Sequence, residues 1–439
     1  MAILKHLLNT QDITSILSLS AIALMVYYLI TFYKHIKKLP PGPWGYPILG
    51  QIKSINMEFH LFLLEQMKKF GKVISLKMGN STLVVLSDYK LIKKAFGSKD
   101  FTARPKTGLS DFLGGYGKGH WPVHANVLER FFRNFATQLS RIFTSFQHVM
   151  TNVTKIWYFA GVINAEGDLW KSQRRYLLHQ KLGMRHWGQG MSQIETRIEH
   201  EAALLLDTMY REHHSVAFNP ANLVNCAVSN VICSMIMSTR FDSHDPAFQR
   251  FMSNFDEGFR LFGMTGSLMW FPWMKILPGI RNSMEKLKSN HQEMLSFVQN
   301  IIHAHKLNLD PSNPRDLIDS YLLMIEKIQN DYSNNNEQEE TKNIFHGVDP
   351  EKQLEQIILD LFSAGVETLK TTVLWSIVYM MYFPEVRKKV QAELDAVVGP
   401  TRLPKVKDMP QLTYTKATMY EIMRRSSVVP LGTTHSTER

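Results

Sequence analysis

The sequence has little cysteine: Cys226 and Cys233 are the only two among 439 residues. They lie seven residues apart in a stretch rich in Val, Ile and Met, so a disulfide framework is excluded and a reducing compartment fits best. We interpret both as small apolar residues on one buried helix, and neither is assigned to a metal. The sequence also contains no internal repeat.

The sequence also lacks the patterns of nucleic-acid binding. Its 50 Lys and Arg residues outnumber 39 Asp and Glu residues, and the net charge of +11 favours anionic partners. These charges are spread along the chain, without a long basic run, zinc-ligand spacing or an RNP-type aromatic motif. We therefore expect a membrane surface or an acidic protein as the partner, and no nucleic acid.

One long uncharged run is present, at residues 13–33. Its length matches the ~20 residues that a helix needs to cross the hydrocarbon core. A cleavable signal peptide is the alternative, but it would have a shorter apolar run, and the aromatic residues near the end of this one fit an interfacial belt. Four basic residues follow within 34–38, so the positive-inside rule places the rest of the chain in the cytosol. Residues 1–38 are interpreted as a membrane anchor with a basic flank.

The remainder divides into a short hinge and a large domain. Residues 39–50, LPPGPWGYPILG, form a stiff proline-rich hinge, or in the plainer alternative an ordinary linker. In the domain, residues 51–439, two β-prone runs flank Gly79-Asn80, which is a hairpin signal. Helical spacing of apolar residues follows, and polar residues 331–341 are expected to be an exposed linker. The two runs cover residues 73–78 and 82–86, and the expected helices cover 193–212, 221–237, 283–306, 314–327, 351–382 and 384–397. The expected fold is mainly α with a small β subdomain.

The expected helix over residues 351–382 contains DLFSAGVETLKTT, residues 360–372. Gly365 in a helix interior costs about 1 kcal/mol relative to Ala, and Glu367 is costly to bury without a partner. A functional site is one interpretation. In the structural alternative, Gly365 makes a close helix contact and Thr368 hydrogen-bonds to the preceding turn.

A second motif, Glu421-Ile-Met-Arg424, lies on an expected helix that ends near Ser426. The three-residue spacing places the carboxylate and the guanidinium on one helix face, where they can form a charge-assisted network with a third group. By itself the motif is ordinarily a solvated ion pair. Its position after AGVET and before VVPLGTTHSTER favours a functional interpretation.

Six features in this order resemble the cytochrome P-450 superfamily of haem-thiolate monooxygenases, microsomal type. They are the uncharged anchor, LPPGPWGYPILG, the WxxxR of residues 170–174, NPRDLIDSYL from residue 313, AGVET, and ExxR followed by PLGTTHST. The resemblance implies the cytochrome P-450 fold preceded by one transmembrane helix. It also implies a haem cofactor, a small apolar substrate, and electrons from NADPH through a membrane-bound flavoprotein reductase.

The resemblance gives catalytic roles to four residues. Thr368 and Glu367 match the family's oxygen-activating threonine and its neighbouring acid. The threonine hydroxyl can hydrogen-bond the iron-bound oxygen, and the acid can deliver protons together with water. Ala364 and Gly365 match the small residues that leave room for dioxygen. Leu369 departs from the family's common small hydroxyl residue, which loosens the assignment of the proton route.

Cofactor roles follow in the same way. Trp170 and Arg174 match the pair that contacts a haem propionate, for which an Arg fork is suited, and His435 matches a second propionate contact. Glu421 and Arg424 match the structural ion pair of the haem-side core, so loss of either is expected to prevent haem incorporation.

The sequence departs from the family in two places. Family members carry an axial cysteine in a loop after ExxR, whereas this sequence ends at Arg439, and neither Cys226 nor Cys233 matches that loop. The sequence therefore predicts a C-terminally truncated, catalytically inactive chain that binds little haem. Residues 118–161 resemble nothing in the family and are interpreted as a retained intron or gene-model error; a true insertion forming a membrane-contact helix is the alternative.

The complete gene product is expected to be a monooxygenase of the endoplasmic reticulum that faces the cytosol. FTARPKTGLSDFLGGYG, AGVETLKTT and RRSSVVPLGTTHST look most like insect enzymes that hydroxylate ecdysteroids, especially at the side-chain end (26-hydroxylase-like). The rival hypothesis is a catalytically dead, membrane-anchored fragment or mis-spliced product. A membrane-tethered helical binding protein without haem explains the anchor but not the ordered motifs.

Overall fold

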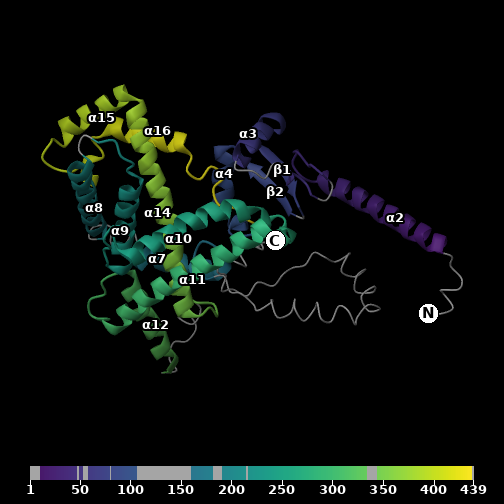
Figure 1. Ribbon diagram of the computed structural model, residues 1–439, viewed down its shortest axis with the longest axis horizontal. Coiled ribbons are helices and arrows are strands. Elements are labelled where there is room, and N and C mark those ends of the chain that lie inside the picture. Colours follow the sequence, from purple (N-terminus) through teal and green to yellow (C-terminus); the bar gives the residue numbers. More distant parts are fainter. Residues whose placement is uncertain are drawn as a thin grey trace. The chain divides into compact units, whose positions relative to one another are not determined.

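The computed structural model describes residues 10–46, 49–52, 58–79, 81–105, 160–180, 190–213, 216–333 and 344–437 (Figure 1). The chain divides into two compact units. Unit 1 comprises Met1–Phe101 and Gly266–Ile276, and unit 2 comprises Thr102–Thr265 and Leu277–Arg439. Most of the residues interpreted as an insertion, 118–159, lie outside the described residues, so that interpretation stays a prediction.

Unit 1 begins with the expected apolar helix. Helix α2 spans Thr10–Ile36 and includes the whole of residues 13–33. Within the described part of the chain it is the one helix whose length and composition suit a membrane span. Residues 18–31 of this helix are all exposed, and Lys34 and His35 lie in its last turn. The sequence prediction of a helix here is confirmed.

Unit 1 also contains a two-stranded β-hairpin and several short helices. Strands β1, Val73–Met78, and β2, Ser81–Leu86, pair antiparallel, and Gly79 adopts a φ of +57° between them, so the predicted hairpin is confirmed. Helix α3, Phe59–Phe70, contacts β1, and Leu63 is buried there. The other elements of the unit are α4, Tyr89–Phe96, η2, Lys99–Phe101, η4, Gly266–Met269, and η5, Pro272–Ile276.

The proline-rich hinge lies directly against β1. The amide of Ser75 donates a hydrogen bond to the carbonyl of Pro41 at 3.1 Å. A Cβ atom at Gly42 would lie 1.8 Å from the carbonyl oxygen of Ser75, so only glycine permits this approach. The first part of the hinge is therefore fixed to the hairpin by backbone contacts.

Unit 2 is helical. It contains α7, Gly167–Gln180; α8, Gly190–His213; α9, Ala221–Met237; α10, Pro246–Thr265; α11, Pro278–Leu307; α12, Leu317–Ser333; α14, Pro350–Tyr382; α15, Pro384–Val397; η6, Val406–Asp408; and α16, Thr413–Ser426. All the helices predicted from apolar spacing are present, and α9 and α15 have the predicted bounds. Residues 331–333 belong to α12, so the exposed linker expected at 331–341 does not begin at residue 331.

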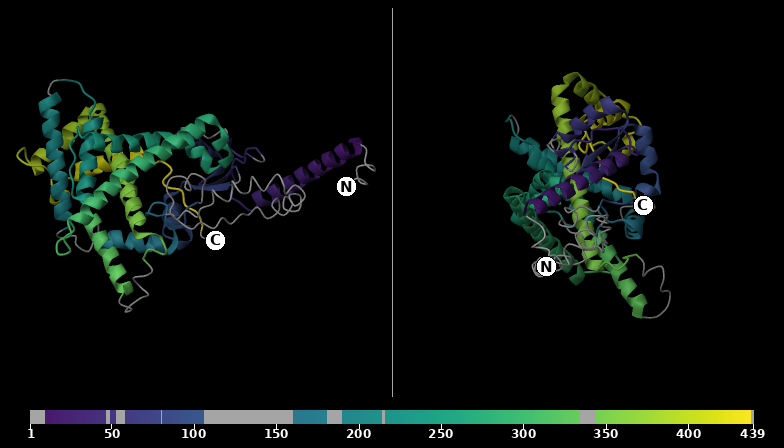
Figure 2. Two further views of the ribbon diagram at one scale, coloured as in Figure 1. Left: turned by 60° about the horizontal axis from the view of Figure 1, so that its bottom comes forward. Right: turned by 90° about the vertical axis from the view of Figure 1, so that its right-hand side faces the viewer.

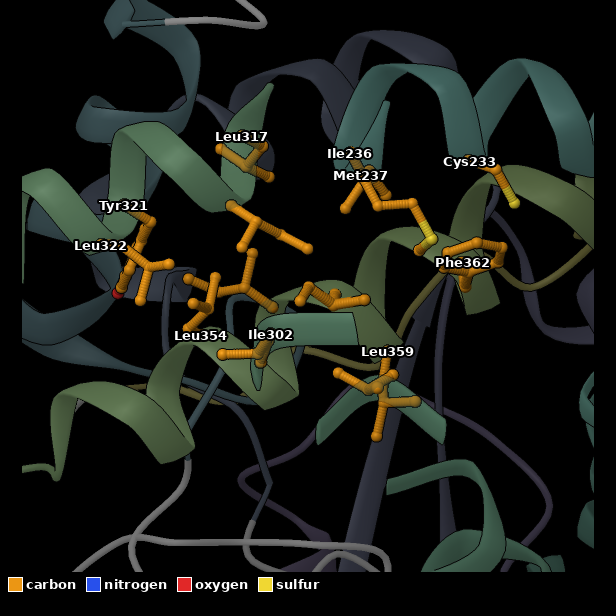
Figure 3. Close-up of a cluster of buried hydrophobic side chains, with 14 of the residues drawn as sticks. Cys233, Ile236, Met237, Ile302, Leu317, Tyr321, Leu322, Leu354, Leu359 and Phe362 are labelled. Atoms are coloured by element: carbon orange, nitrogen blue, oxygen red, sulfur yellow. The ribbon is translucent and has the colours of Figure 1, made fainter. Parts of the chain in front are cut away.

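The core of unit 2 forms around the first half of α14, and Figures 1 and 2 show the helices of this unit beside it. Figure 3 shows side chains of α9, α11, α12 and α14 meeting there, including Met237, Ile302, Tyr321 and Phe362. Helices α15 and α16 contact each other and the later part of α14. This arrangement holds α14 from several sides and fixes the segment that carries AGVET.

Candidate active site

The first turns of α14 are set by a cap and by burial. Asp349 accepts hydrogen bonds from the backbone amides of Glu351 and Lys352, both at 3.0 Å, and Pro350 occupies the first helical position. Every residue from 353 to 360 is buried. A helix that is buried on all sides has little freedom to shift, so the residues that follow are held in place.

Asp360 ties α14 to the segment that leads into α7. One of its carboxylate oxygens accepts from the amides of Val162 and Ile163 at 2.7 and 2.9 Å. Gln353 adds a two-way pairing, since its side chain accepts from the Gly161 amide and donates to the Gly161 carbonyl at 3.0 and 2.9 Å. Burial raises the pKa of Asp360, although its hydrogen bonds oppose the shift. The described end of the expected insertion, residues 160–161, is thus part of this core.

The AGVET segment lies where burial gives way to exposure. The Thr368 hydroxyl donates to the carbonyl of Ala364 at 2.7 Å. A Cβ atom at Gly365 would lie 3.0 Å from the Cδ1 of Ile232 on α9. Gly365 and Thr368 therefore have the contacts of the structural alternative, a close helix approach and a bond to the preceding turn. The side chain of Ala364 is exposed, and Thr368 is only partly buried.

Glu367 is held by a cation that the sequence did not single out. Lys370, one turn later, forms an ion pair with a carboxylate oxygen of Glu367 and a second one with Asp256 of α10 at 2.9 Å. The other Glu367 oxygen accepts from the Thr371 hydroxyl at 3.2 Å. The ion pair between Glu367 and Lys370 could have been predicted from the sequence, because residues three apart lie on the same face of a helix.

Trp170 and Arg174 lie together on α7, with the guanidinium carbon 5.6 Å from the ring centroid. Gln173, between them, is buried; it donates to the carbonyl of Ile344 and accepts from the Tyr321 hydroxyl, both at 2.8 Å. One face of the WxxxR turn is therefore fixed to the core. Arg174 lies on the opposite face of this turn and is exposed.

Arg104 is a second cation that the sequence reasoning missed. Its guanidinium donates to the carbonyl of Ile163 at 3.0 Å, to the Thr433 hydroxyl at 3.2 Å and to the Thr434 carbonyl at 3.0 Å. It thereby joins the segment before α7 to the segment that carries His435. Burial lowers the pKa of Arg104. The sequence shows this arginine in FTARP but does not indicate its role, because its hydrogen-bond partners lie far away along the chain.

Glu421 and Arg424 form the predicted ion pair on α16. The guanidinium donates to both carboxylate oxygens, at 2.7 and 2.8 Å, and Arg425 donates to one of them at 2.7 Å. Hydrogen bonds from the two arginines lower the pKa of Glu421 to about 2. All three side chains are exposed, so the third group in this network is Arg425 and the cluster lies at the surface of unit 2.

Comparison with known proteins decides the family. The model of the cytochrome P450 family matches residues 40–157 and 138–439, which is nearly the whole chain. This chain belongs to the cytochrome P450 family. The two matched ranges overlap at residues 138–157, within the segment interpreted as an insertion, and these residues lie outside the described part of the chain.

The relatives come from arthropods and mammals. Cytochrome P450 18a1 of Drosophila melanogaster is 38% identical over 427 residues, covering 96% of this chain and 69% of the relative. Cytochrome P450 2J5 of Mus musculus is 32% identical, covering 91% and 68%. Cytochrome P450 2J2 of Homo sapiens is 31% identical, covering 90% and 68%. The P450 is by family an oxidoreductase, a haem monooxygenase that takes electrons from a redox partner.

The two cysteines of this P450 are core residues of α9. Cys233 is fully buried and Cys226 is partly buried, which agrees with the prediction of one shared helix. Burial raises the pKa of both thiols. A thiol with a raised pKa stays protonated, and only the thiolate is a good metal ligand.

A buried polar cluster joins the end of α11 to the start of α12. His305, Asp316 and Asp319 are buried, with potential ligand atoms within 4.8 Å of one another. Arg315 donates to both oxygens of Asp319 at 2.7 and 2.9 Å, and His305 contacts Asp316 at 2.9 Å. The protein's own cations therefore balance these carboxylates, and the NPRDLIDSYL motif forms an ion-pair cluster.

Proposed function

We propose that this P450 is a single-pass enzyme of the endoplasmic reticulum that inserts one oxygen atom into an apolar steroid, of the ecdysteroid class. Its electrons come from NADPH through a membrane-bound flavoprotein reductase. The observation that carries the proposal is the pair Glu367–Thr368, which lies at the edge of the core on a helix that is buried over residues 353–360 and at Phe362. Helix α2 and its basic flank support a membrane anchor with the domain in the cytosol.

The residues of unit 2 fit the carboxylate edge of a haem. A haem carries two propionates, and Arg guanidinium groups suit carboxylates because they present paired donors. Arg174 and Trp170 supply one group of donors, and His435 a second. Arg104 connects the two segments that carry them. We assign all four residues to the propionates, with Arg104 added by the structure.

When bound, the haem supplies the oxygen chemistry, and the protein supplies positioning and protons. In its hydrogen bond to Ala364 the Thr368 hydroxyl uses its proton, so its oxygen lone pairs remain available to a ligand-side donor. Glu367 is one-third exposed, which lets water exchange protons with its carboxylate. Ala364 presents only a methyl group on the exposed side and leaves room beside the threonine.

The reductase and the substrate follow from charge and family likeness. A net charge of +11 suits an acidic flavoprotein, because complementary charge raises the rate of encounter. The resemblance of FTARPKTGLSDFLGGYG, AGVETLKTT and RRSSVVPLGTTHST to insect ecdysteroid hydroxylases supports an insect steroid as the substrate class. The 38% identity to cytochrome P450 18a1 of Drosophila melanogaster agrees with an insect-type enzyme.

The test is turnover in microsomes. The enzyme is expressed from its complete coding sequence together with the flavoprotein reductase, and ecdysteroids are supplied with NADPH. We expect a product heavier by one oxygen atom, measured by mass spectrometry, and none without NADPH. Microsomes that contain the haem-loaded enzyme but form no oxygenated steroid would contradict the substrate.

The site is tested with two threonine variants. Thr368→Ala removes the assigned hydroxyl, and we expect product formation to fall by on the order of 100-fold. Thr372→Ala is the matched control, because Thr372 makes the same bond to the preceding turn, at 2.8 Å, and has no assigned role. Equal losses in the two variants would mean that the effect is helical and not catalytic.

A further inference from the structure

Lys370 is an unexpected residue to find beside the candidate site. Its side chain is only 13% exposed. An ammonium group with so little water needs carboxylate partners, because an unpaired buried charge is very costly. Lys370 has two such partners, and they come from different helices: Glu367 from α14 and Asp256 from α10.

The contacts fix both oxygens of Glu367. One oxygen is paired with the Lys370 ammonium, and the other accepts from Thr371 at 3.2 Å. A carboxylate held at both oxygens loses rotational freedom and keeps one orientation on the helix. Its neighbour Thr368 is held separately, through the Ala364 carbonyl.

Helix α10 is well placed to control this lysine. Phe251 and Phe255 of α10 pack on Phe362 of α14, with ring centroids 5.1 and 6.1 Å apart. Asp256, next in the chain, reaches Lys370 at 2.9 Å. The lysine is therefore shared between a carboxylate on its own helix and one on a packed neighbour.

The charge of Lys370 is stable. Burial by itself would lower the pKa of Lys370, but hydrogen bonds to Glu367 and Asp256 outweigh that effect, and the pKa is raised. The side chain is thus an ammonium ion throughout the working range of pH.

We infer that Lys370 is a positioning residue for the proton-delivering carboxylate of Glu367, and that Asp256 of α10 determines how firmly Lys370 holds it. The inference rests on the proposed role of Glu367. It predicts that the geometry of the α10–α14 contact affects how efficiently protons reach the site. Lys370 itself contacts neither substrate nor cofactor.

The partition of reducing equivalents measures positioning. Each NADPH with one dioxygen and one proton yields either one oxygenated product and one water, or one hydrogen peroxide without product. We expect Lys370→Met in the holoenzyme to lower the ratio of product to peroxide by about tenfold. Lys370→Arg keeps the charge and should restore most of the ratio. Asp256→Asn should change it in the same direction as Lys370→Met, by a smaller factor.

The matched control is Lys388→Met. Lys388 pairs with Glu385 at the same three-residue spacing, but on α15 and with both side chains well exposed. We expect the product-to-peroxide ratio of this variant to equal that of the wild type. Equal ratios in Lys370→Met and wild type, at equal haem content, would overturn the inference.

A second readout is independent of turnover. In a double-mutant cycle of thermal unfolding, Asp256→Asn and Lys370→Met should be non-additive, because the two side chains are in contact. Additive effects would show that the bridge is absent and would overturn the inference. Glu367→Gln separates the two ideas: if it leaves the product-to-peroxide ratio unchanged, the proposed role of Glu367 fails; if it lowers the ratio while Lys370→Met does not, only the role of Lys370 fails.

Discussion

The two halves of α14 differ sharply in their surroundings. Up to Phe362 the helix is enclosed, with residues 353–360 all buried. Beyond Lys370 none of its residues is buried and several large apolar side chains are exposed, among them Met381 and Tyr382 at 72% and 77%. The residues of AGVET occupy the turn and a half between these regions.

This difference explains how the site is both fixed and accessible. Full burial of a large apolar side chain stabilises a fold by roughly 1.5–3 kcal/mol, so the first half is a rigid support. An exposed half contributes little of this kind. Thr368 and Glu367 follow directly after the support, and their side chains remain open to solvent or to a ligand.

The largest effect is expected from two aromatic truncations on the same helix. Phe362 is 1% exposed and contacts Phe251 and Phe255, so Phe362→Ala should lower the free energy of unfolding by about 4 kcal/mol through lost burial and a cavity. Tyr382→Ala should cost less than about 1 kcal/mol. Both are measured by thermal unfolding of the detergent-solubilised chain. Similar losses would break the distinction between the two halves.

The next effect concerns the polar clamp of the enclosed half. Asp360→Ala leaves the amides of Val162 and Ile163 without their acceptor, and we expect a loss of about 3 kcal/mol. Asp360→Asn retains an oxygen acceptor and should lose about 1 kcal/mol. Unfolding midpoints measure both. A milder effect of alanine than of asparagine would show that these hydrogen bonds do not hold the segment.

A smaller effect is expected from the pH dependence of stability, which His305 contributes from the buried core of unit 2. His305 has an acceptor at each ring nitrogen, Ile301 and Asp316, both at 2.9 Å, and a neutral imidazole has only one N–H. Burial opposes its charge, but the hydrogen bonds outweigh burial and raise the pKa of His305. The added stability is therefore complete below the unfolded pKa and is lost as pH rises through the folded pKa.

We expect the unfolding temperature of the wild type to decrease by this route as pH rises from the ordinary pKa of histidine, about 6.5, through the raised pKa of His305 in the folded state. His305→Phe should remove that part of the pH dependence and cost about 2 kcal/mol at pH 6, because it deletes hydrogen bonds of a charged group. His303→Phe is the control, because His303 lies on the same helix, α11, but is exposed. A wild type that becomes more stable as pH rises over this range would contradict the assignment.

Helix positions were predictable because apolar periodicity follows from burial. Residues 221–237 and 384–397 have the predicted bounds, and the hairpin at Gly79 was given by its turn residues. The ends of α14 and α11 shift because capping by Asp349 and a proline at residue 278 extend them. These signals are local, and local reasoning finds them.

The partners of the site residues were not predictable in the same way. Lys370 could be paired with Glu367 by spacing, but Asp256 is 114 residues away. The contacts of Arg104 with Thr433 and Thr434 cross about 330 residues. Such contacts depend on how helices pack, which periodicity does not specify. The sequence could therefore propose candidate residues for the site, whereas the contacts that Lys370 and Arg104 make with distant segments depend on the packing.

The smallest expected effect gives the sharpest test of the exposed half. Met381→Ser removes an apolar side chain at the surface, and surface substitutions ordinarily change the free energy of unfolding by less than about 0.5 kcal/mol. Ile358→Ser, on the enclosed half and fully buried, is its partner and should cost several times more, because it combines lost burial with a hydroxyl in the core. If Met381→Ser instead lowered the unfolding midpoint as much as Ile358→Ser, the second half of α14 would be covered in solution. The accessible position of Glu367 and Thr368 would then need another explanation.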